Sequence, residues 1–139
     1  MPVSSNNNAP AFRRSLRWLA VVVWCGIIFA ASHRANLRVA DDDMVDLILR
    51  KAGHISVFAV LTWLLARALR SPRMSVSVAL LLAWLGAFVY AISDEWHQTF
   101  ITGRVGHPSD VMIDMIGATI AALVLHRCWT QTRSEDHIP

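Results

Sequence analysis

The sequence predicts an all-α membrane protein, a bundle of four transmembrane helices with both termini on the cytoplasmic side. Composition is the first reason: 55% of the 139 residues are apolar and 17% are charged, against roughly 25% charged residues in an ordinary soluble domain. The second reason is that the charged residues lie between four apolar runs and rarely inside them. A chain of this length forms one domain. We expect residues 15–129 to be the membrane domain, and residues 1–14 and 130–139 to be disordered cytoplasmic tails.

The candidate spans are the four apolar runs, at residues 18–32, 55–69, 74–93 and 111–125. Only the third run reaches the roughly 20 residues that a bilayer core requires. The other three need flanking basic side chains that extend to the headgroups. Ahead of the second run, the acidic residues 41–43 either cap a short interfacial helix or belong to a solvated loop.

Basic residues between the runs predict the orientation. With a cytoplasmic amino terminus, eight Lys and Arg residues lie on the cytoplasmic side and five on the other. This bias follows the positive-inside rule and places residues 94–110 outside. The first run also resembles a signal peptide, because a basic start precedes a short apolar stretch and "AAS". Its removal would leave the other three spans in the same orientation.

Polar residues gather at the outer ends of three predicted helices, most densely in "SDEWHQTFITGR". Residues three or four apart share one helix face, and each of these helices has such a stripe running from polar to small or apolar residues. The stripes are Lys51, His54, Phe58 and Thr62; Ala83, Ala87, Tyr90, Asp94 and His97; and Asp110, Asp114, Gly117 (or Ala118) and Ala121. We therefore expect an outward-facing polar pocket, below which the small residues of the fourth helix contact the small face of the third.

The pocket carries both signs of charge. Lys51, Arg104 and the positive ends of two helices favour an anion, whereas Asp94, Glu95, Asp110 and Asp114 favour a cation. This mixture suits a phosphorylated or zwitterionic headgroup, or a phosphate together with a metal ion. Alternatively, Asp114 pairs with Arg104 and only ties the fourth helix to the loop. The sequence has neither an H-E-x-x-H motif nor paired cysteines, so we predict no metal site and no cofactor.

The same residues resemble the VanZ-like family of small bacterial membrane proteins, over roughly residues 15–128. The resemblance rests on "KAGHISVF", "SDEWHQTFITGR" and "SDVMIDMIGA". The matching positions are Lys51, His54, Asp94, Glu95, His97, Gln98, Phe100, Arg104, Asp110 and Gly117. Asp114 departs from the family, which commonly has Asn there. The founding member is linked to teicoplanin resistance, so the resemblance implies a role in the cell envelope and a location in the bacterial cytoplasmic membrane.

Two functions of different classes remain open. In the first, the pocket binds an anionic or zwitterionic ligand such as a lipid headgroup, a cell-wall precursor or a glycopeptide-like molecule, through Lys51, His54, Asp94, Glu95, His97, Gln98, Arg104, Asp110 and Asp114. In the second, the protein is an enzyme acting on a lipid-linked phosphate or ester, with Asp94 or Glu95 and His97 as an acid/base pair. The expected partners are membrane lipids or lipid-linked precursors and not nucleic acid, because the arginines flank apolar runs. A channel is a weaker third option, and the oligomeric state is left open.

Overall fold

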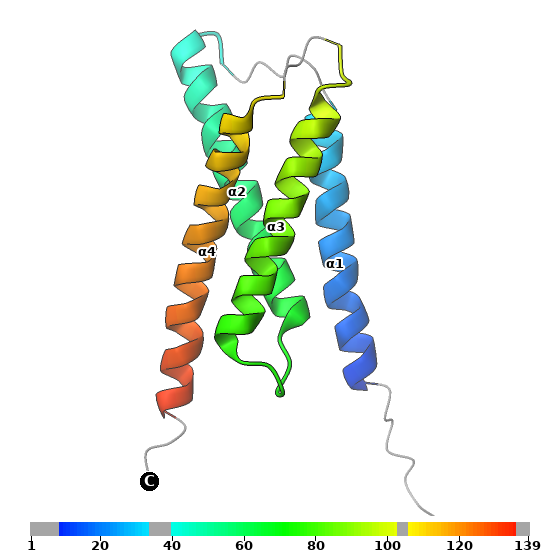
Figure 1. Cartoon of the computed structure of the whole chain (residues 1–139), viewed down its shortest axis with the longest axis vertical. Coiled ribbons are helices and arrows are strands. Elements are labelled where there is room, and N and C mark those ends of the chain that lie inside the picture. Colours follow the sequence, from blue (N-terminus) through cyan, green and yellow to red (C-terminus); the bar gives the residue numbers. More distant parts are fainter. Residues whose placement is uncertain (1–8, 34–39, 103–105, 136–139) are drawn as a thin grey trace, which may run out of the picture.

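The computed structural model describes residues 9–33, 40–102 and 106–135, which fold into four α-helices without a strand among them. The helices are α1 (Ala9–Ser32), α2 (Asp43–Leu69), α3 (Val76–Gln98) and α4 (Pro108–Glu135). They run up and down along one common direction (Figure 1). Each is long and apolar enough to cross a membrane. The predicted all-α, four-helix membrane fold is thus confirmed, and its orientation in the membrane stays a prediction.

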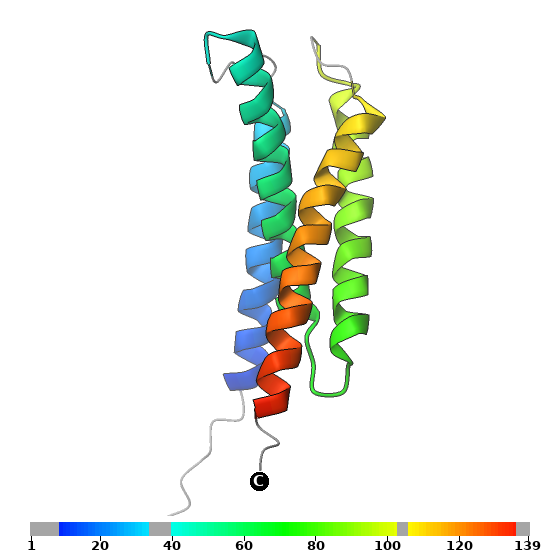
Figure 2. The same cartoon turned by 90° about the vertical axis from the view of Figure 1, so that its left-hand side faces the viewer.

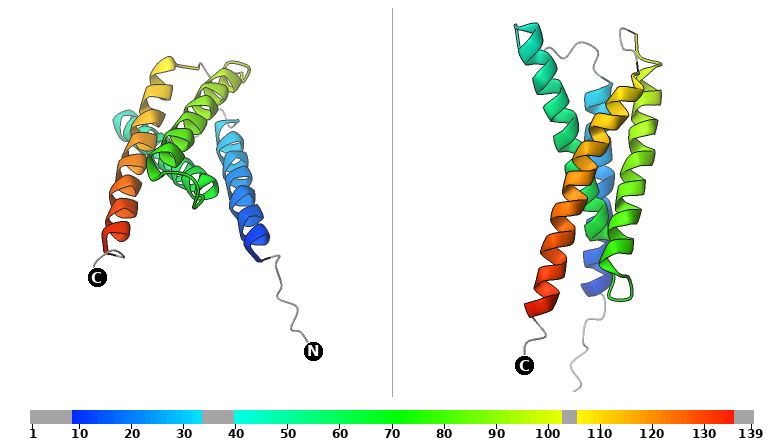
Figure 3. Two further views of the ribbon diagram at one scale, coloured as in Figure 1. Left: turned by 60° about the horizontal axis from the view of Figure 1, so that its bottom comes forward. Right: turned by 60° about the vertical axis from the view of Figure 1, so that its left-hand side comes forward.

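The start of α1 and the end of α4 lie at the same end of the bundle in both views of Figure 3. We call this the proximal end, and it also carries the connection between α2 and α3 (Figure 1). The opposite, distal end is where α1 and α3 finish and where α2 and α4 begin. This is the arrangement that four consecutive spans require.

The helices are longer than the apolar runs that predicted them. The side chain of Asp42 caps α2, accepting hydrogen bonds from the backbone N–H groups of Met44 and Val45, both at 2.9 Å. The acidic segment therefore begins a single 27-residue helix and not a separate one. Helix also extends past both limits of the predicted membrane domain, from Ala9 and to Glu135. Those domain limits themselves stay a prediction.

Small residues on α3 form much of the core. Ala83, Ala87 and Ala91 are fully buried and leave room for close approach of neighbouring helices. Opposite them, α2 contributes Phe58 and Leu61, which are also fully buried. Helix α2 packs against the other three helices, and α4 packs against both α2 and α3, beside which it runs in Figure 2. Many large apolar side chains point outward instead, as expected of helices whose surroundings are lipid.

Gly117 corrects one predicted contact. We expected this residue to face α3, but a Cβ at position 117 would stand 2.0 Å from the backbone oxygen of Ile55 in α2. Gly117 therefore lies directly against the α2 backbone, while the adjacent Ala118 is in the apolar core cluster. The predicted face of α4 is buried as expected, but its glycine meets the other neighbouring helix.

Candidate functional site

The polar stripes predicted on three helices meet at the distal end. We call this group the distal polar cluster, and it comprises Lys51 and His54 of α2, Asp94, Glu95 and Gln98 of α3, and Asp110 and Asp114 of α4. Four of these side chains are almost completely buried, with exposed fractions of 4% for Asp94, 6% for Glu95, 4% for Gln98 and 0% for Asp114. Buried acids of this kind are costly in a membrane protein and mark functional sites by default.

Two pairs connect α2 to α4 within this cluster. Lys51 forms an ion pair with Asp110, and Nδ1 of His54 lies 2.8 Å from Oδ1 of Asp114. The partners are three residues apart on α2 and four apart on α4, so the pairs occupy successive turns of the two helices. The contact at Gly117 lies about one turn further along α4 and brings the two helices close enough for both pairs. The partner of Asp114 is thus His54; Arg104, the alternative partner and a predicted anion ligand, lies outside the described residues.

Asp94 and Glu95 each use one carboxylate oxygen. Oδ2 of Asp94 accepts hydrogen bonds from Ser32 Oγ at 2.8 Å and from Gln98 Nε2 at 3.0 Å. Oε2 of Glu95 accepts a hydrogen bond from the backbone N–H of His107 at 2.9 Å. The other oxygens, Asp94 Oδ1 and Glu95 Oε1, have no hydrogen-bond partner among the described residues, and the same holds for Asp114 Oδ2.

The ring of His97 lies against α1. It stacks on Phe29 with a centroid distance of 4.4 Å, and the buried Nε2 of His97 has no hydrogen-bond partner in the described part of the chain. No hydrogen bond joins His97 to Asp94 or Glu95 among the described residues, and the acid/base pair stays a prediction. Each residue of an α-helix is rotated by about 100° from the one before it. The side chain of residue 98 therefore points more nearly in the direction of Asp94 than the side chain of residue 97 does. The carboxylate–imidazole pair in the described structure is His54–Asp114.

A cleft of about 250 Å³ opens between α1 and α2 beside the cluster. Its polar lining consists of Ser32, His54 and Asp94, with Arg50 at the same site. The remaining lining is apolar or small and comprises Ile27, Ile28, Ala31, Leu49, Gly53, Val57 and Phe58. The contribution of α1 to this cleft was not predicted from the sequence. The spacing of Val21, Cys25, Ile28 and Ser32 could have indicated it, because residues at this spacing share one helix face and the serine therefore faces inward.

Potential metal ligands also converge in this region. One ligand atom each from His54, Glu95 and Asp114 lies within 4.8 Å of the other two. The three residues belong to three different helices, so no local sequence motif could indicate them. The sequence alone predicts no metal site.

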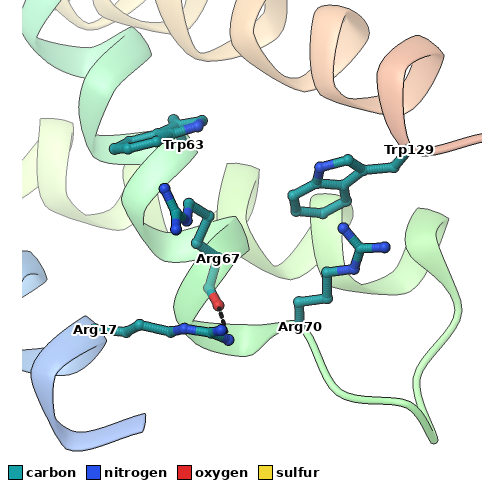
Figure 4. A pocket seen from close by; sticks show the side chains of 5 residues that line it. All are labelled: Arg17, Trp63, Arg67, Arg70 and Trp129. Carbon is teal, nitrogen blue, oxygen red and sulfur yellow. Dashed lines mark hydrogen bonds between the residues drawn. The ribbon is translucent and has the colours of Figure 1, made fainter. Parts of the chain in front are cut away.

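The proximal end has the opposite character. Arg17, Trp63, Arg67, Arg70 and Trp129 line a cavity of about 310 Å³ there (Figure 4). The guanidinium groups of Arg67 and Arg70 lie over the rings of Trp63 and Trp129, at 4.7 and 4.3 Å from the ring centroids. Arg17 donates a hydrogen bond to the backbone oxygen of Arg67 at 3.2 Å. Arginine and tryptophan are typical of a membrane–water interface.

Four membrane-length helices with acids buried at one end and arginines at the other define a small multi-pass membrane protein. The VanZ/LLP1 family model matches residues 12–129, so the chain belongs to that family, as the resemblance of its motifs predicted. No curated protein and no solved structure matches the chain.

Proposed function

We propose that this VanZ-family protein has a role in the cell envelope of a bacterium and binds the zwitterionic headgroup of a membrane lipid or lipid-linked precursor. The ligand would enter the cleft between α1 and α2 from the outer leaflet of the cytoplasmic membrane. The single observation that carries the proposal is the lining of this cleft, which is mostly apolar or small but includes the polar side chains of Ser32, Arg50, His54 and Asp94. An amphiphile likewise combines an apolar chain with a polar headgroup.

The charges at the cleft favour a zwitterion over a simple anion. One acid, Asp94, and one base, Arg50, are among the lining residues. Asp94 is buried and retains an oxygen without a partner among the described residues, so it suits an ammonium group. Arg50 is about half exposed and pairs with Asp46 at 2.8 Å, so it can reach a phosphate at the rim. Lys51, which the sequence suggested as an anion ligand, is already paired with Asp110.

The size of the cleft limits the ligand. Its volume of about 250 Å³ is slightly below the roughly 300–1,000 Å³ of ordinary small-molecule pockets. A headgroup with the start of its acyl chain suits this space, whereas an entire glycopeptide does not. An effect on teicoplanin susceptibility would then arise through the envelope lipid or precursor that the protein binds.

Gly53 offers a test that leaves the polar residues intact. It lines the cleft, and a Cβ added there would meet no atom within 4 Å. Gly53→Leu should therefore fill the cleft without a backbone clash. Gly26→Leu is the matched control, because position 26 is equally open and does not line the cleft. Native mass spectrometry with phosphatidylethanolamine, phosphatidylglycerol and phosphatidylcholine should detect a lipid adduct on the wild type and on Gly26→Leu, and should lose it on Gly53→Leu. Lipid adducts of equal intensity on the wild type, Gly26→Leu and Gly53→Leu would contradict the proposal.

The enzyme alternative is supported by one different observation. His54 lines the cleft, and Asp114 holds its Nδ1, as a carboxylate orients a histidine that exchanges protons. Ser32 lines the cleft and its hydroxyl donates to Asp94. Other hydroxyls near this end of the bundle are all exposed, namely those of Ser93, Thr99, Thr102 and Ser109. In proteoliposomes, an enzyme would release a headgroup or acyl product detectable by mass spectrometry. His54→Gln would then stop the release and preserve the lipid adduct, whereas a binding protein shows no release in either form.

A further inference from the structure

We propose that His54, Glu95 and Asp114 form a binding site for one divalent transition-metal ion, of the Zn²⁺ or Mn²⁺ class, between α2, α3 and α4. The proposal is independent of the ligand suggested for the cleft. It starts from geometry, because a ligand atom from each residue lies within 4.8 Å of the other two. Three converging protein ligands are the usual number in a metal site that keeps coordination positions open.

Unused carboxylate oxygens provide a second and independent indication. Asp114 is fully buried, binds His54 through Oδ1 and leaves Oδ2 without a partner among the described residues. Glu95 is 6% exposed, receives the backbone N–H of His107 on Oε2 and leaves Oε1 without a partner in the same part of the chain. Buried polar atoms are nearly always satisfied, so such exceptions indicate a missing ion, water or ligand.

The balance of charge favours a cation over a water molecule. The buried carboxylates of Glu95 and Asp114 lie close together, and a third buried acid, Asp94, immediately precedes Glu95 in α3. The basic side chain of Lys51 is paired with Asp110. Desolvated like charges repel strongly unless a cation or a proton neutralises them. A water molecule satisfies hydrogen bonds but supplies no charge.

The donor types select the class of metal. Imidazole suits Zn²⁺ and neighbouring transition metals, whereas Mg²⁺ and Ca²⁺ prefer sites composed of oxygen alone. The contact of Glu95 with the His107 backbone is a typical outer interaction that orients a ligating carboxylate. Gly106 allows this contact, since a Cβ there would lie 2.5 Å from the backbone oxygen of Glu95. Gly106 can therefore lie directly against the backbone of Glu95, one of the proposed metal ligands.

Metal binding can be measured directly on the purified full-length chain. The protein is stripped with a chelator in detergent and then titrated with Zn²⁺, Mn²⁺, Mg²⁺ or Ca²⁺. We expect about one Zn²⁺ or Mn²⁺ per chain by elemental analysis, together with a higher melting temperature, because a ligand that binds only the folded state stabilises it. Wild-type protein that binds none of these ions in stoichiometric amount overturns the proposal without any variant.

Isosteric variants then assign the site. Glu95→Gln and Asp114→Asn should each weaken the binding by roughly tenfold or more, comparable to the loss of a supporting ligand in known sites. Asp46→Asn is the matched control, since Asp46 is a buried acid at the same end of the bundle that pairs with Arg50. An equal loss in Asp46→Asn, or unchanged binding in the two site variants, contradicts the assignment.

X-ray absorption on the Zn²⁺-loaded wild type covers the case in which a variant does not fold. We expect nitrogen and oxygen donors at about 2.0–2.2 Å, with one imidazole. A sulfur donor to the Zn²⁺ would indicate binding through a cysteine and would overturn the proposal. Two or more imidazole donors would overturn it as well. Loss of lipid binding at the cleft would leave all three metal measurements unchanged, so the two proposals fail separately.

Discussion

Gly117 of α4 lies against the backbone of Ile55 in α2, so closely that a Cβ at position 117 would stand 2.0 Å from the Ile55 oxygen. The pair between His54 and Asp114 is one residue away on α2 and three on α4. The close backbone approach and the buried polar pair are therefore parts of one contact. A glycine in the packing surface positions the acid of the site, because the two helices could not approach this far with a side chain between them.

Gly117→Ala should destabilise the fold. The added methyl group meets backbone and not a flexible side chain, so the helices must separate, at a cost of about 1–3 kcal/mol. Gly26→Ala is the control: its Cβ meets nothing within 4 Å, and it should be neutral or more stable by up to about 1 kcal/mol from helix propensity. Thermal unfolding in detergent measures both. An unchanged melting temperature for Gly117→Ala would mean that this contact is looser than described.

Asp114→Asn and Asp114→Ala should differ in their free energy of unfolding when metal has been removed by a chelator. Asp114→Asn keeps an oxygen that can bond to His54 and removes a fully buried charge, so we expect a change within about 1 kcal/mol. Asp114→Ala leaves His54 without this partner and should cost about 1–3 kcal/mol. The free energy of unfolding in detergent distinguishes them. Similar losses in both variants would show that the carboxylate charge, and not the hydrogen bond, stabilises the contact.

Helical spacing alone predicted two of the three inward faces. Phe58 and Thr62 on α2, and Asp114 with Ala118 on α4, are fully buried as expected. On α3 the spacing allowed two neighbouring stripes, one through Tyr90 and His97 and one through Ala91 and Gln98. The second is the more deeply buried. Both stripes satisfy the same three-or-four spacing, so only the position of the neighbouring helices decides between them.

The pairings could not be predicted for a different reason. Spacing along a helix indicates which residues share a face, but it does not specify the neighbouring helix. The partner of Gly117, the convergence of His54 with Glu95, and the approach of Ser32 to Asp94 all join residues from different helices. Each depends on how far one helix is rotated and shifted against another. The boundaries of α2 were missed because the apolar run begins only after the polar residues of its first turns.

Cysteine labelling should test the orientation. After Cys25 and Cys128 are replaced, His107→Cys at the distal end should react with a membrane-impermeant reagent from outside the cell, because position 107 is exposed and follows α3. Arg73→Cys, also exposed and located between α2 and α3, should react only after the cytoplasmic side is opened. The physical basis is the excess of arginine at the proximal end. The reverse pattern would place the cleft on the cytoplasmic side and exclude a ligand from the outer leaflet.

Substitutions of Asp94 and of His97 should have different effects in a functional test, although both residues belong to the same motif. Asp94 lines the cleft, so Asp94→Asn should lose the lipid adduct and the phenotype in a deletion strain while it melts close to the wild type. The ring of His97 stacks on Phe29, and His97 is not among the residues that line the cleft. His97→Phe keeps an aromatic ring and should preserve stability, adduct and phenotype. His97→Ala should lower stability by about 0.5–1.5 kcal/mol, the usual contribution of an aromatic pair. A His97→Phe protein that folds normally but loses the phenotype would show that the imidazole nitrogen of His97 takes part in function. That result would contradict the restriction of function to residues that line the cleft.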